Sequence, residues 1–417
     1  MKYLLILVKN HMLVFRSLKY YNYRLFFTGQ SISLVGTWMQ RVAISWLVYR
    51  LTGSPFILGL ITFASLFPSL VLAPFAGSLV DRHNKFRIFW ITQILLMLQA
   101  GTLALMVWLN YYNILWIGIL SLVQGLVTSL DVTARQSLVV NLVGQKEDIP
   151  NAIALNSSVF NGARLIGPAI AGIILSSFGE NVCFLINFLS YIAVLICLSL
   201  MKIKLDKIEK STENIWFDLK EGFRYIKATP NISSLILLMA ASSLLVIPFT
   251  TFLPVFAKDI FHGDATTFSW FESCGGLGAL SGAIYMATLK SHRNFTKIII
   301  QSGFLLSISV FALAVSPNLI MALFFTATAA LSLMAQNSSI NTYLQTHTSD
   351  KMRGRTMSYY IMAFQGILPI GTLMMGYLAH LFGTALIVAF EGIAGILIML
   401  SFIYYRKQRI KDVKAGL

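Results

Sequence analysis

The sequence is short of charge, and this shortage excludes most soluble folds. Asp, Glu, Lys and Arg make up only 12% of its 417 residues, whereas an ordinary soluble domain has about 25%. Hydrophobic residues account for 57% of the chain, and the mean hydropathy is +0.74. We therefore expect an integral membrane protein.

Residues and motifs for covalent or metal chemistry are also scarce. The three cysteines lie in apolar runs, and their positions give neither a disulfide framework nor metal-ligand spacing. The sequence has no Gly-x-x-x-x-Gly-Lys-[Ser/Thr] phosphate loop, which argues against a primary pump. It also has no covalent catalytic constellation, so we predict that the protein is not an enzyme and has no cofactor.

What the sequence has instead is a succession of long apolar runs. A helix that crosses the hydrocarbon core needs about 20 mainly apolar residues. Turn-forming residues separate twelve such runs, which predicts twelve transmembrane helices. These runs lie at roughly 25–49, 55–80, 87–109, 113–138, 151–177, 182–201, 231–256, 266–289, 295–315, 318–342, 356–379 and 384–405.

Basic residues indicate on which side of the membrane each loop lies, because Lys and Arg accumulate in cytoplasmic loops. With a cytoplasmic N-terminus, 27 of the 32 Lys and Arg fall on the cytoplasmic side. Arg50 and Lys258 fall outside, and Arg41, Arg135 and Arg164 fall within helices. We therefore expect both termini to be cytoplasmic. This topology, with attraction to anionic lipid headgroups, accounts for the net charge of +16 without a nucleic-acid partner.

The longest loop divides the helices six and six. Within it, Ile215, Leu219, Phe223 and Ile226 recur at helical spacing, which predicts a short helix along the membrane surface that ties the two bundles together. The predicted organisation is a cytosolic lead-in, a first bundle, a linker with its amphipathic helix, a second bundle and a basic tail, at 1–24, 25–201, 202–230, 231–405 and 406–417.

The two halves of the sequence show weak similarity to each other. At a constant offset, the run Ala-Arg-Gln-Ser at 134–137 matches Ala-Gln-Asn-Ser at 335–338, and Pro168 matches Pro369. Each match is weak alone. Together with six helices per half, they suggest a duplicated unit in which a substrate path lies between two pseudo-symmetric bundles.

The end of the second helix resembles the loop signature of the major facilitator superfamily, Gly-x-x-x-Asp-Arg-x-Gly-[Arg/Lys]. Gly77, Asp81, Arg82 and Lys85 match it. Asn84 replaces the second glycine, and asparagine tolerates left-handed backbone geometry. The resemblance implies a cytoplasmic gate in which Asp81 and Arg82 latch the two bundles. The alternative is that these basic residues only fix the topology.

The fourth helix has a charged pair near its cytoplasmic end. Asp131 and Arg135 are four residues apart, so they share a face and can neutralise each other. One interpretation is a structural pair, networked with Arg82 and part of the gate. The other is that Asp131 belongs to a proton relay, because charges within membrane helices are functional by default.

The fifth helix contains Arg-x-x-Gly-Pro-x-x-x-Gly, which resembles the antiporter signature of the same superfamily. Gly167 and Gly172 allow close helix contact, and Pro168 removes one backbone hydrogen bond and favours a bend. A structural kink alone is an equally good interpretation of the motif.

Deep charges in other helices are candidates for the transport site. Arg41, beside Gln40, and Arg164 have no acid on their own helices, while Glu272 and Glu391 lie in the second half. Full mutual pairing is one possibility. The other is a cavity whose cationic N-terminal wall, including Gln40, binds an anionic substrate, with protonatable carboxylates on the C-terminal side.

The resemblance extends over nearly the whole chain, through segments such as Gly-Thr-Trp-Met-Gln at 36–40 and Met-Arg-Gly-Arg-Thr-Met at 352–357. They resemble a bacterial branch that includes the enterobactin exporter, other siderophore exporters and macrolide efflux proteins. The resemblance implies the major facilitator fold, an all-α membrane protein of twelve helices in two bundles. It also implies efflux by alternating access, driven by a proton gradient, in a bacterial inner membrane.

Several functions remain open from the sequence. The preferred hypothesis is an exporter of a small anionic metabolite such as a siderophore. The alternatives are a broad multidrug or macrolide pump, an uptake transporter, and a membrane scaffold or sensor without transport. Expected partners are the small-molecule substrate, the lipid bilayer and a periplasmic or outer-membrane export component, and we expect a monomer.

Overall fold

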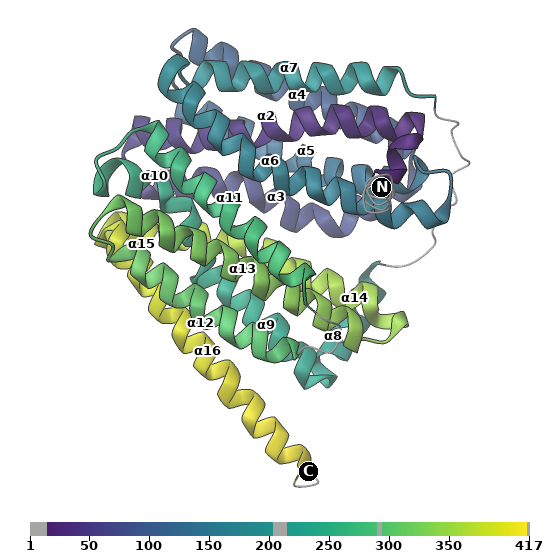
Figure 1. The fold of residues 1–417 in the computed structure, drawn as a ribbon, viewed down its shortest axis with the longest axis vertical. Helices are drawn as coiled ribbons and strands as arrows, with labels where there is room; N and C mark the ends of the chain where they lie inside the picture. Colours follow the sequence, from purple (N-terminus) through teal and green to yellow (C-terminus); the bar gives the residue numbers. More distant parts are fainter. Residues whose placement is uncertain (1–14, 203–214, 290–293, 415–417) are drawn as a thin grey trace, which may run out of the picture. The chain divides into compact units, whose positions relative to one another are not determined.

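The computed structural model describes residues 15–202, 215–289 and 294–414, without the side chains at 73–78, 81–82, 215–219, 350–351 and 409–414. The regular structure in these residues is helical throughout (Figure 1). The long helices are α2 (Tyr21–Thr52), α3 (Pro55–Arg82), α4 (Lys85–Trp108), α5 (Ile114–Asn141), α6 (Ile149–Phe178), α7 (Glu180–Ser199), α9 (Pro230–Leu245), α11 (Ala265–Ala287), α12 (Phe295–Ala314), α13 (Leu319–His347), α15 (Leu368–Phe382) and α16 (Thr384–Lys414).

Ten helical segments of the described chain are long and apolar enough to cross a membrane. Helices α2 and α11 are not among the ten, although they have 32 and 23 residues. Both are diluted by polar residues, and they carry Arg41 and Glu272 respectively. With these two helices the twelve long segments predicted from the sequence are present, and the all-α membrane fold is confirmed.

Helix ends follow local turn chemistry. Gly179 lies between α6 and α7, and Gly383 lies between α15 and α16. Their φ angles are +83° and +92°, which residues other than glycine rarely adopt. Asn84 does not adopt the left-handed backbone conformation expected from the loop signature. Its φ is −65°, and its side chain caps α4 by accepting a hydrogen bond from the Arg87 amide at 3.0 Å.

Close contacts divide the chain into two units, which we describe separately. The first unit comprises residues 1–44, 72–113 and 123–211. Its main core is formed by side chains such as Tyr23, Phe26, Phe89 and Val194. Helices α4 and α7 lie side by side in this unit (Figure 1).

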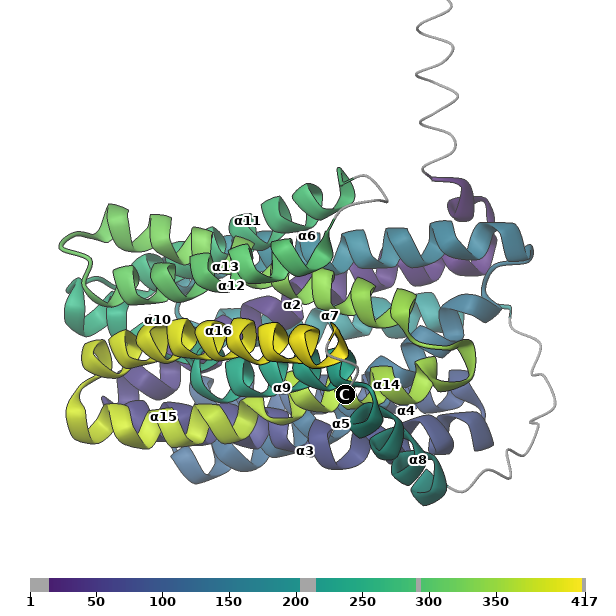
Figure 2. The same cartoon turned by 90° about the horizontal axis from the view of Figure 1, so that it is seen from below.

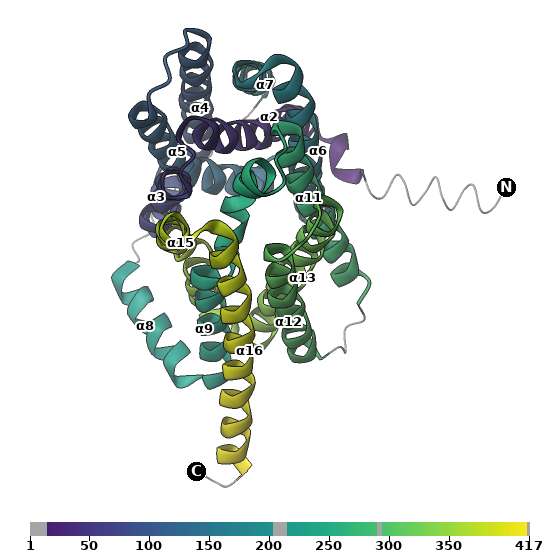
Figure 3. The same cartoon turned by 90° about the vertical axis from the view of Figure 1, so that its left-hand side faces the viewer.

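The second unit comprises residues 45–71, 114–122 and 212–417. It therefore includes the last two turns of α2 and the first half of α3, in addition to the second half of the chain. Helices α11, α13 and α12 pack in succession (Figure 2), and α16 packs against α12 and α9 (Figure 3).

Two of the expected spans, 231–256 and 356–379, are interrupted and not continuous α-helices. After α9 the chain continues as a 3₁₀ turn η3 (Ile247–Phe252), a single turn α10 (Leu253–Val255) and a π turn η4 (Phe256–Ile260). Pro248 and Pro254 lie in this stretch, and proline removes the hydrogen bonds that continue an α-helix. Likewise α14 (Asp350–Ile361) is separated from α15 by a π turn η5 (Met362–Gly366), shortly before Pro369.

The linker contains helix α8 (Ile215–Ala228), in the stretch where the apolar periodicity predicts a surface helix. It packs on α14 in the second unit. Arg355 forms an ion pair with Glu221, and Gly222 lies so close that a Cβ there would be 3.1 Å from the Arg355 Cβ. The linker helix is thus anchored to the unit formed by the second half of the chain.

Candidate transport site

The structure brings Arg41 and Arg164 together on one aromatic ring. The Arg41 guanidinium carbon lies 5.1 Å from the ring centroid of Trp38, and that of Arg164 lies 5.7 Å from it. Arg41 is one turn after Trp38 on α2, whereas Arg164 comes from α6. The sequence indicates two deep arginines, but it gives no indication that a tryptophan joins them.

Gly167 of the antiporter-like motif allows α6 to approach α2 closely enough for Arg164 to reach the Trp38 ring. A Cβ on Gly167 would lie 2.6 Å from the Trp38 Cβ and 3.1 Å from the Val35 carbonyl oxygen. Helices α2 and α6 therefore cross closely at this glycine, and Arg164, one turn before it, reaches the indole. Pro168 and Gly172 are also buried, and α6 is continuous through Pro168.

The cluster is accessible as well as cationic. Arg41 is exposed on its helix, and Arg164 is half-buried. Phe160, which is 41% exposed, meets the Trp38 ring edge-on at 5.8 Å between centroids. An exposed guanidinium in the middle of a membrane-length helix usually faces a bundle interior or a water-filled cavity, and a guanidinium over an indole gains about 0.5 to 2 kcal/mol.

Gln40 lies on the other side of α2, inside the first unit. It is 1% exposed, its amide donates a hydrogen bond to Gln99 at 2.9 Å, and its carbonyl accepts one from Asn187 at 2.7 Å. Gly36 leaves room for this network, because a Cβ there would lie 2.7 Å from the Asn187 amide oxygen. Through these two hydrogen bonds, Gln40 holds α2 to α4 and α7.

Asp131 and Arg135 are both buried, and each engages a neighbouring helix. Asp131 accepts hydrogen bonds from Thr92 at 2.9 Å and from Gln93 at 2.6 Å, both on α4. Arg135 donates to the Gln30 side chain on α2 at 3.2 Å. This arrangement favours a structural role for the pair, because it ties α5 to two neighbouring helices.

Glu391 on α16 has an unusual environment. It is 0% exposed, and among the described residues neither carboxyl oxygen has a hydrogen-bond partner. The adjacent Gly392 packs against α12, where a Cβ would lie 2.6 Å from the Phe311 nitrogen. Burial of a carboxyl group without a hydrogen-bond partner is costly. Glu272, the other carboxylate candidate, is half-buried on α11.

The cytoplasmic gate expected from the loop signature is only partly described. Gly77, Asp81 and Arg82 lie outside the residues whose side chains the structure describes. Lys85 is half-buried at the start of α4. The latch between the two bundles therefore stays a prediction.

Asp148 anchors a cluster of charged side chains that the sequence pattern does not reveal. The Asp148 side chain is 2% exposed and forms an ion pair with Arg16. It forms a second ion pair with Lys19, at 2.7 Å, and accepts a hydrogen bond from the Tyr20 hydroxyl, also at 2.7 Å. The hydrogen bond to Asp148 raises the pKa of Lys19 above its usual value. The acids Glu147 and Asp148 are visible in the sequence, but nothing in it brings them to the basic residues of the lead-in, which are more than 120 positions away. The cluster fastens the lead-in before α2 to the start of α6.

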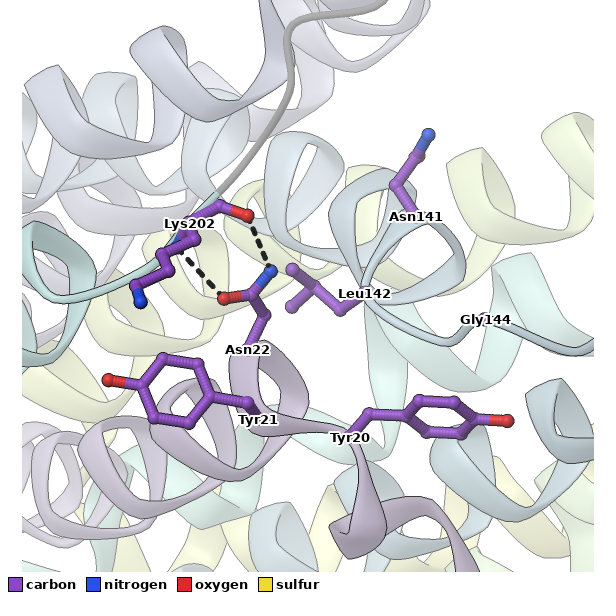
Figure 4. A pocket seen from close by; sticks show the side chains of 7 residues that line it. All are labelled: Tyr20, Tyr21, Asn22, Asn141, Leu142, Gly144 and Lys202. Carbon is purple, nitrogen blue, oxygen red and sulfur yellow. Dashed lines mark hydrogen bonds between the residues drawn. The ribbon is translucent and has the colours of Figure 1, made fainter.

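A cavity of about 550 Å³ lies beside this cluster (Figure 4). Asn22 closes one side of it by exchanging two hydrogen bonds of 2.9 Å with the backbone of Lys202. Its lining residues are Tyr20, Tyr21, Asn22, Asn141, Leu142, Gly144 and Lys202. Arg41 lies about 30 Å further along α2, at 1.5 Å per residue, so this cavity is distinct from the arginine cluster.

The second unit contains a contact between the end of α2 and the helices of the second half. The Tyr49 hydroxyl donates a hydrogen bond to Asp259, and the Lys258 ammonium lies 5.5 Å from the Tyr49 ring centroid. One turn earlier, Trp46 stacks on Phe268 at 6.2 Å between centroids. These residues lie at the end of the helices where the sequence predicts the outer surface.

The backbones of α3 and α15 lie in close contact in the same unit. A Cβ on Gly59 would lie 2.6 Å from the Thr372 carbonyl oxygen and 3.3 Å from the Gly376 Cα. The two backbones can approach this closely because both contact positions lack a side chain.

Comparison with known proteins gives a consistent picture. A family model described as "Transmembrane secretion effector" matches residues 14–416. The chain is 27% identical over 393 residues to the staphyloferrin A transporter of Staphylococcus aureus, covering 93% of this chain and 96% of that relative. It is 26% identical to the enterobactin exporter EntS of Shigella flexneri, with 93% of each covered. It is 23% identical to the multidrug efflux pump Tap of Mycolicibacterium fortuitum, with 82% and 85% covered.

Solved structures show the same fold at lower identity. The nucleoside transporter NupG superposes with a TM-score of 0.72 at 15% identity, covering 94% of this chain and 99% of that chain. A bacterial homolog of the human lysosomal transporter Spinster, inward-facing and occupied, superposes with a TM-score of 0.73 at 12% identity, with 93% and 97% covered.

Proposed function

The chain belongs to the transmembrane secretion effector family of the major facilitator superfamily, as its loop and fifth-helix motifs indicate, and we propose that it exports a small anionic metabolite. It is a multi-pass membrane transporter and not an enzyme. The observation that carries the proposal is the pair of guanidiniums, Arg41 and Arg164, gathered on the Trp38 ring. Guanidinium groups suit carboxylates and other oxyanions because they donate two parallel hydrogen bonds.

The cargo we propose is a siderophore-like anion. The relatives include proteins named as a staphyloferrin A transporter and an enterobactin exporter, which match more than nine-tenths of the chain. Both are named for moving one metabolite, and the cluster around Trp38 offers the positive charge that an anionic chelator requires.

The proposed mechanism is alternating access in a bacterial inner membrane, with both termini cytoplasmic. Arg41 and Arg164 bind the cargo near the midplane, and an outer closure that includes Tyr49 and Asp259 must open to release it. The interrupted helices around η3 and η5 support this mechanism, because transporter helices are commonly broken where they line a substrate path. Gly77, Asp81, Arg82, Lys85 and Arg135 form the cytoplasmic gate of the proposal.

Proton antiport supplies the energy in this proposal. Glu391 is the first candidate for the proton carrier, because its buried carboxyl has no described hydrogen-bond partner. Glu272 on α11 is the second candidate. Asp131 is the third, because its two hydrogen bonds to α4 already give it a structural task. We expect a monomer that delivers its cargo to a periplasmic or outer-membrane component.

The experiment that tests the function compares the small molecules secreted by cells with and without the protein under iron limitation, by mass spectrometry. We expect one chelating anion to disappear from the medium and accumulate inside the cells. The Arg41→Gln and Arg164→Gln variants should reproduce the deletion, while Trp108→Leu, at an exposed end of α4, should not. An unchanged secretion profile in the deletion strain would refute the siderophore assignment.

A multidrug pump is the second candidate. Phe160 and Trp38 give the cluster an aromatic surface that suits apolar drugs, and one relative is named as a multidrug efflux pump. Drug susceptibility of the deletion strain separates the two functions. If the protein is a multidrug pump, resistance will fall for neutral and cationic drugs, and Arg41→Gln and Arg164→Gln will leave it unchanged.

A further inference from the structure

The cavity at one end of the first unit is distinct from the proposed cargo site. We propose that it binds the headgroup of an anionic phospholipid. Its volume of about 550 Å³ is in the range of pockets that enclose small molecules. The lining comes from the first residues of α2, the end of α5 and Lys202, which follows α7 by three residues. Because these helices are of membrane-crossing length, their ends lie at a boundary of the membrane, where headgroups are found.

Specific contacts hold the walls of the cavity in place. Asn22 exchanges two hydrogen bonds of 2.9 Å with the backbone of Lys202, which fixes this lysine beside the start of α2 (Figure 4). Gly144 leaves room for the Tyr20 ring, because a Cβ there would lie 3.0 Å from the Tyr20 Cε1. The Tyr20 hydroxyl is bonded to Asp148. The positions of the lysine and of this aromatic wall are therefore set by the fold.

The groups that line the cavity suit an anion. Lys202 has an ammonium group, Tyr21 a hydroxyl and Asn141 an amide, and each of these groups can donate a hydrogen bond to a phosphate oxygen. In the view of Figure 4, the Lys202 and Tyr21 side chains extend to the same side. The seven lining residues include no acid, and Asp148, which contacts the wall, is paired with two cations. A phosphate group in the cavity therefore meets a net positive charge.

Exposed apolar side chains beside the cavity favour a lipid over a free phosphate. Ile196 and Leu200, at the end of α7, are 56% and 52% exposed. They are four residues apart and so share a face, and Leu200 is two residues before Lys202. Tyr21, which is 46% exposed, is of a type enriched at membrane boundaries. A phospholipid whose acyl chains lie along this face of α7 can place its phosphate at Lys202.

The charge of the lining also distinguishes between headgroups. Phosphatidylethanolamine has an ammonium group beside its phosphate, and this cation would find no carboxylate among the lining residues. Phosphatidylglycerol has hydroxyl groups there, which can bond to the Asn141 amide. In the orientation that we propose, this end of the unit faces the cytoplasmic leaflet, where anionic lipids attract basic residues. The cavity therefore favours phosphatidylglycerol.

The test measures lipid binding to the purified full-length protein in detergent by native mass spectrometry. The probes are phosphatidylglycerol and phosphatidylethanolamine with identical acyl chains. We expect Lys202→Ala to lower the preference for phosphatidylglycerol about fivefold, the contribution of one basic residue close to anionic lipid. The bonds to Asn22 come from the Lys202 backbone, so they survive this substitution. Lys202→Arg should retain the preference, and Lys146→Ala, which removes an exposed lysine outside the lining, is the matched control.

A second variant tests the cavity separately from its charge. Asn141→Trp fills the cavity, leaves the net charge unchanged and should weaken phosphatidylglycerol binding by at least the same factor. Gln145→Trp, at an exposed position outside the lining, is its control and should have no effect. A variant that does not fold is replaced by Lys202→Gln or Asn141→Phe.

Three results would overturn the proposal. Equal losses in Lys202→Ala and Lys146→Ala would show a general attraction of lipid to a basic surface. An effect of Lys202→Ala without one of Asn141→Trp would place the lipid outside the cavity. The third concerns inorganic phosphate and glycerol 3-phosphate, added to protein that carries phosphatidylglycerol. We expect neither to displace the lipid, because its acyl chains add to its affinity, and displacement by either would assign the cavity to a soluble phosphate compound.

Discussion

The hydroxyl of Tyr49, in the last turn of α2, donates a hydrogen bond to the carboxylate of Asp259 in η4. The two residues are 210 positions apart in the sequence and come from different sequence halves. In the alternating-access mechanism that we propose, this bond breaks when the outer side opens, and its strength contributes to the balance between the closed and open states.

We predict that Tyr49→Phe loosens this closure. A hydrogen bond to a charged group contributes about 1.5 to 3 kcal/mol, so the free energy of unfolding of the purified protein should fall by up to that amount. Asp259→Asn should have a similar but smaller effect. Thermal unfolding in detergent measures the change, with Tyr111→Phe on an exposed loop as control. Equal stability of all three variants and the wild type would show that the bond contributes nothing.

A second prediction concerns two glycines of α6. Gly167→Ala should destabilise the protein by about 1 to 3 kcal/mol, because the added methyl overlaps Trp38 and forces α2 away. Gly162→Ala is the matched control, since a Cβ there meets nothing within 4 Å. It should stabilise the helix by about 0.5 to 1 kcal/mol. Denaturant unfolding measures both variants, and equal effects would mean that the α2–α6 crossing is not tight at Gly167.

The third prediction tests proton coupling. Glu391→Gln should abolish efflux driven by a pH gradient in everted vesicles while leaving expression and stability unchanged, because the carboxyl has no described partner to lose. Glu272→Gln should also abolish it if the two carboxylates share the task. Asp131→Asn should instead lower stability, because it disturbs the hydrogen bonds to Thr92 and Gln93. Unchanged transport in both glutamine variants would eliminate these carboxylates as proton carriers.

The fourth prediction concerns the linker. Arg355→Ala removes the ion pair with Glu221, which at partial exposure contributes at most about 1 kcal/mol. Global stability should hardly change, but α8 should detach more often, and its cleavage by chymotrypsin, which does not cut at the substituted positions, should accelerate about two- to fivefold. The charge swap Glu221→Arg with Arg355→Glu should restore protection, and Lys220→Ala, on an exposed position of α8, should leave it unchanged. A swap that fails to restore protection would show that the pair does not hold the helix.

The sequence by itself determined the membrane class, the number of long helices and the unusual charges. Hydropathy and turn chemistry act over about 20 neighbouring residues, so they are visible without the fold. The same locality explains the errors. A hydropathy average conceals the breaks after α9 and before α15, although Pro248, Pro254 and Pro369 are visible in the sequence. It also gives no means of choosing between a left-handed turn and a helix cap at Asn84.

Only the tertiary structure decided which of these residues meet. Trp38 and Arg164 are 126 positions apart, and they touch because Gly167 lacks the side chain that would keep α2 and α6 separate. The pairing of Asp148 with the lead-in and the burial of Gln40 depend in the same way on helices packed across long sequence separations. Composition and spacing show which side chains each helix carries. The close backbone approach permitted at a few glycines decides which of these side chains form a site.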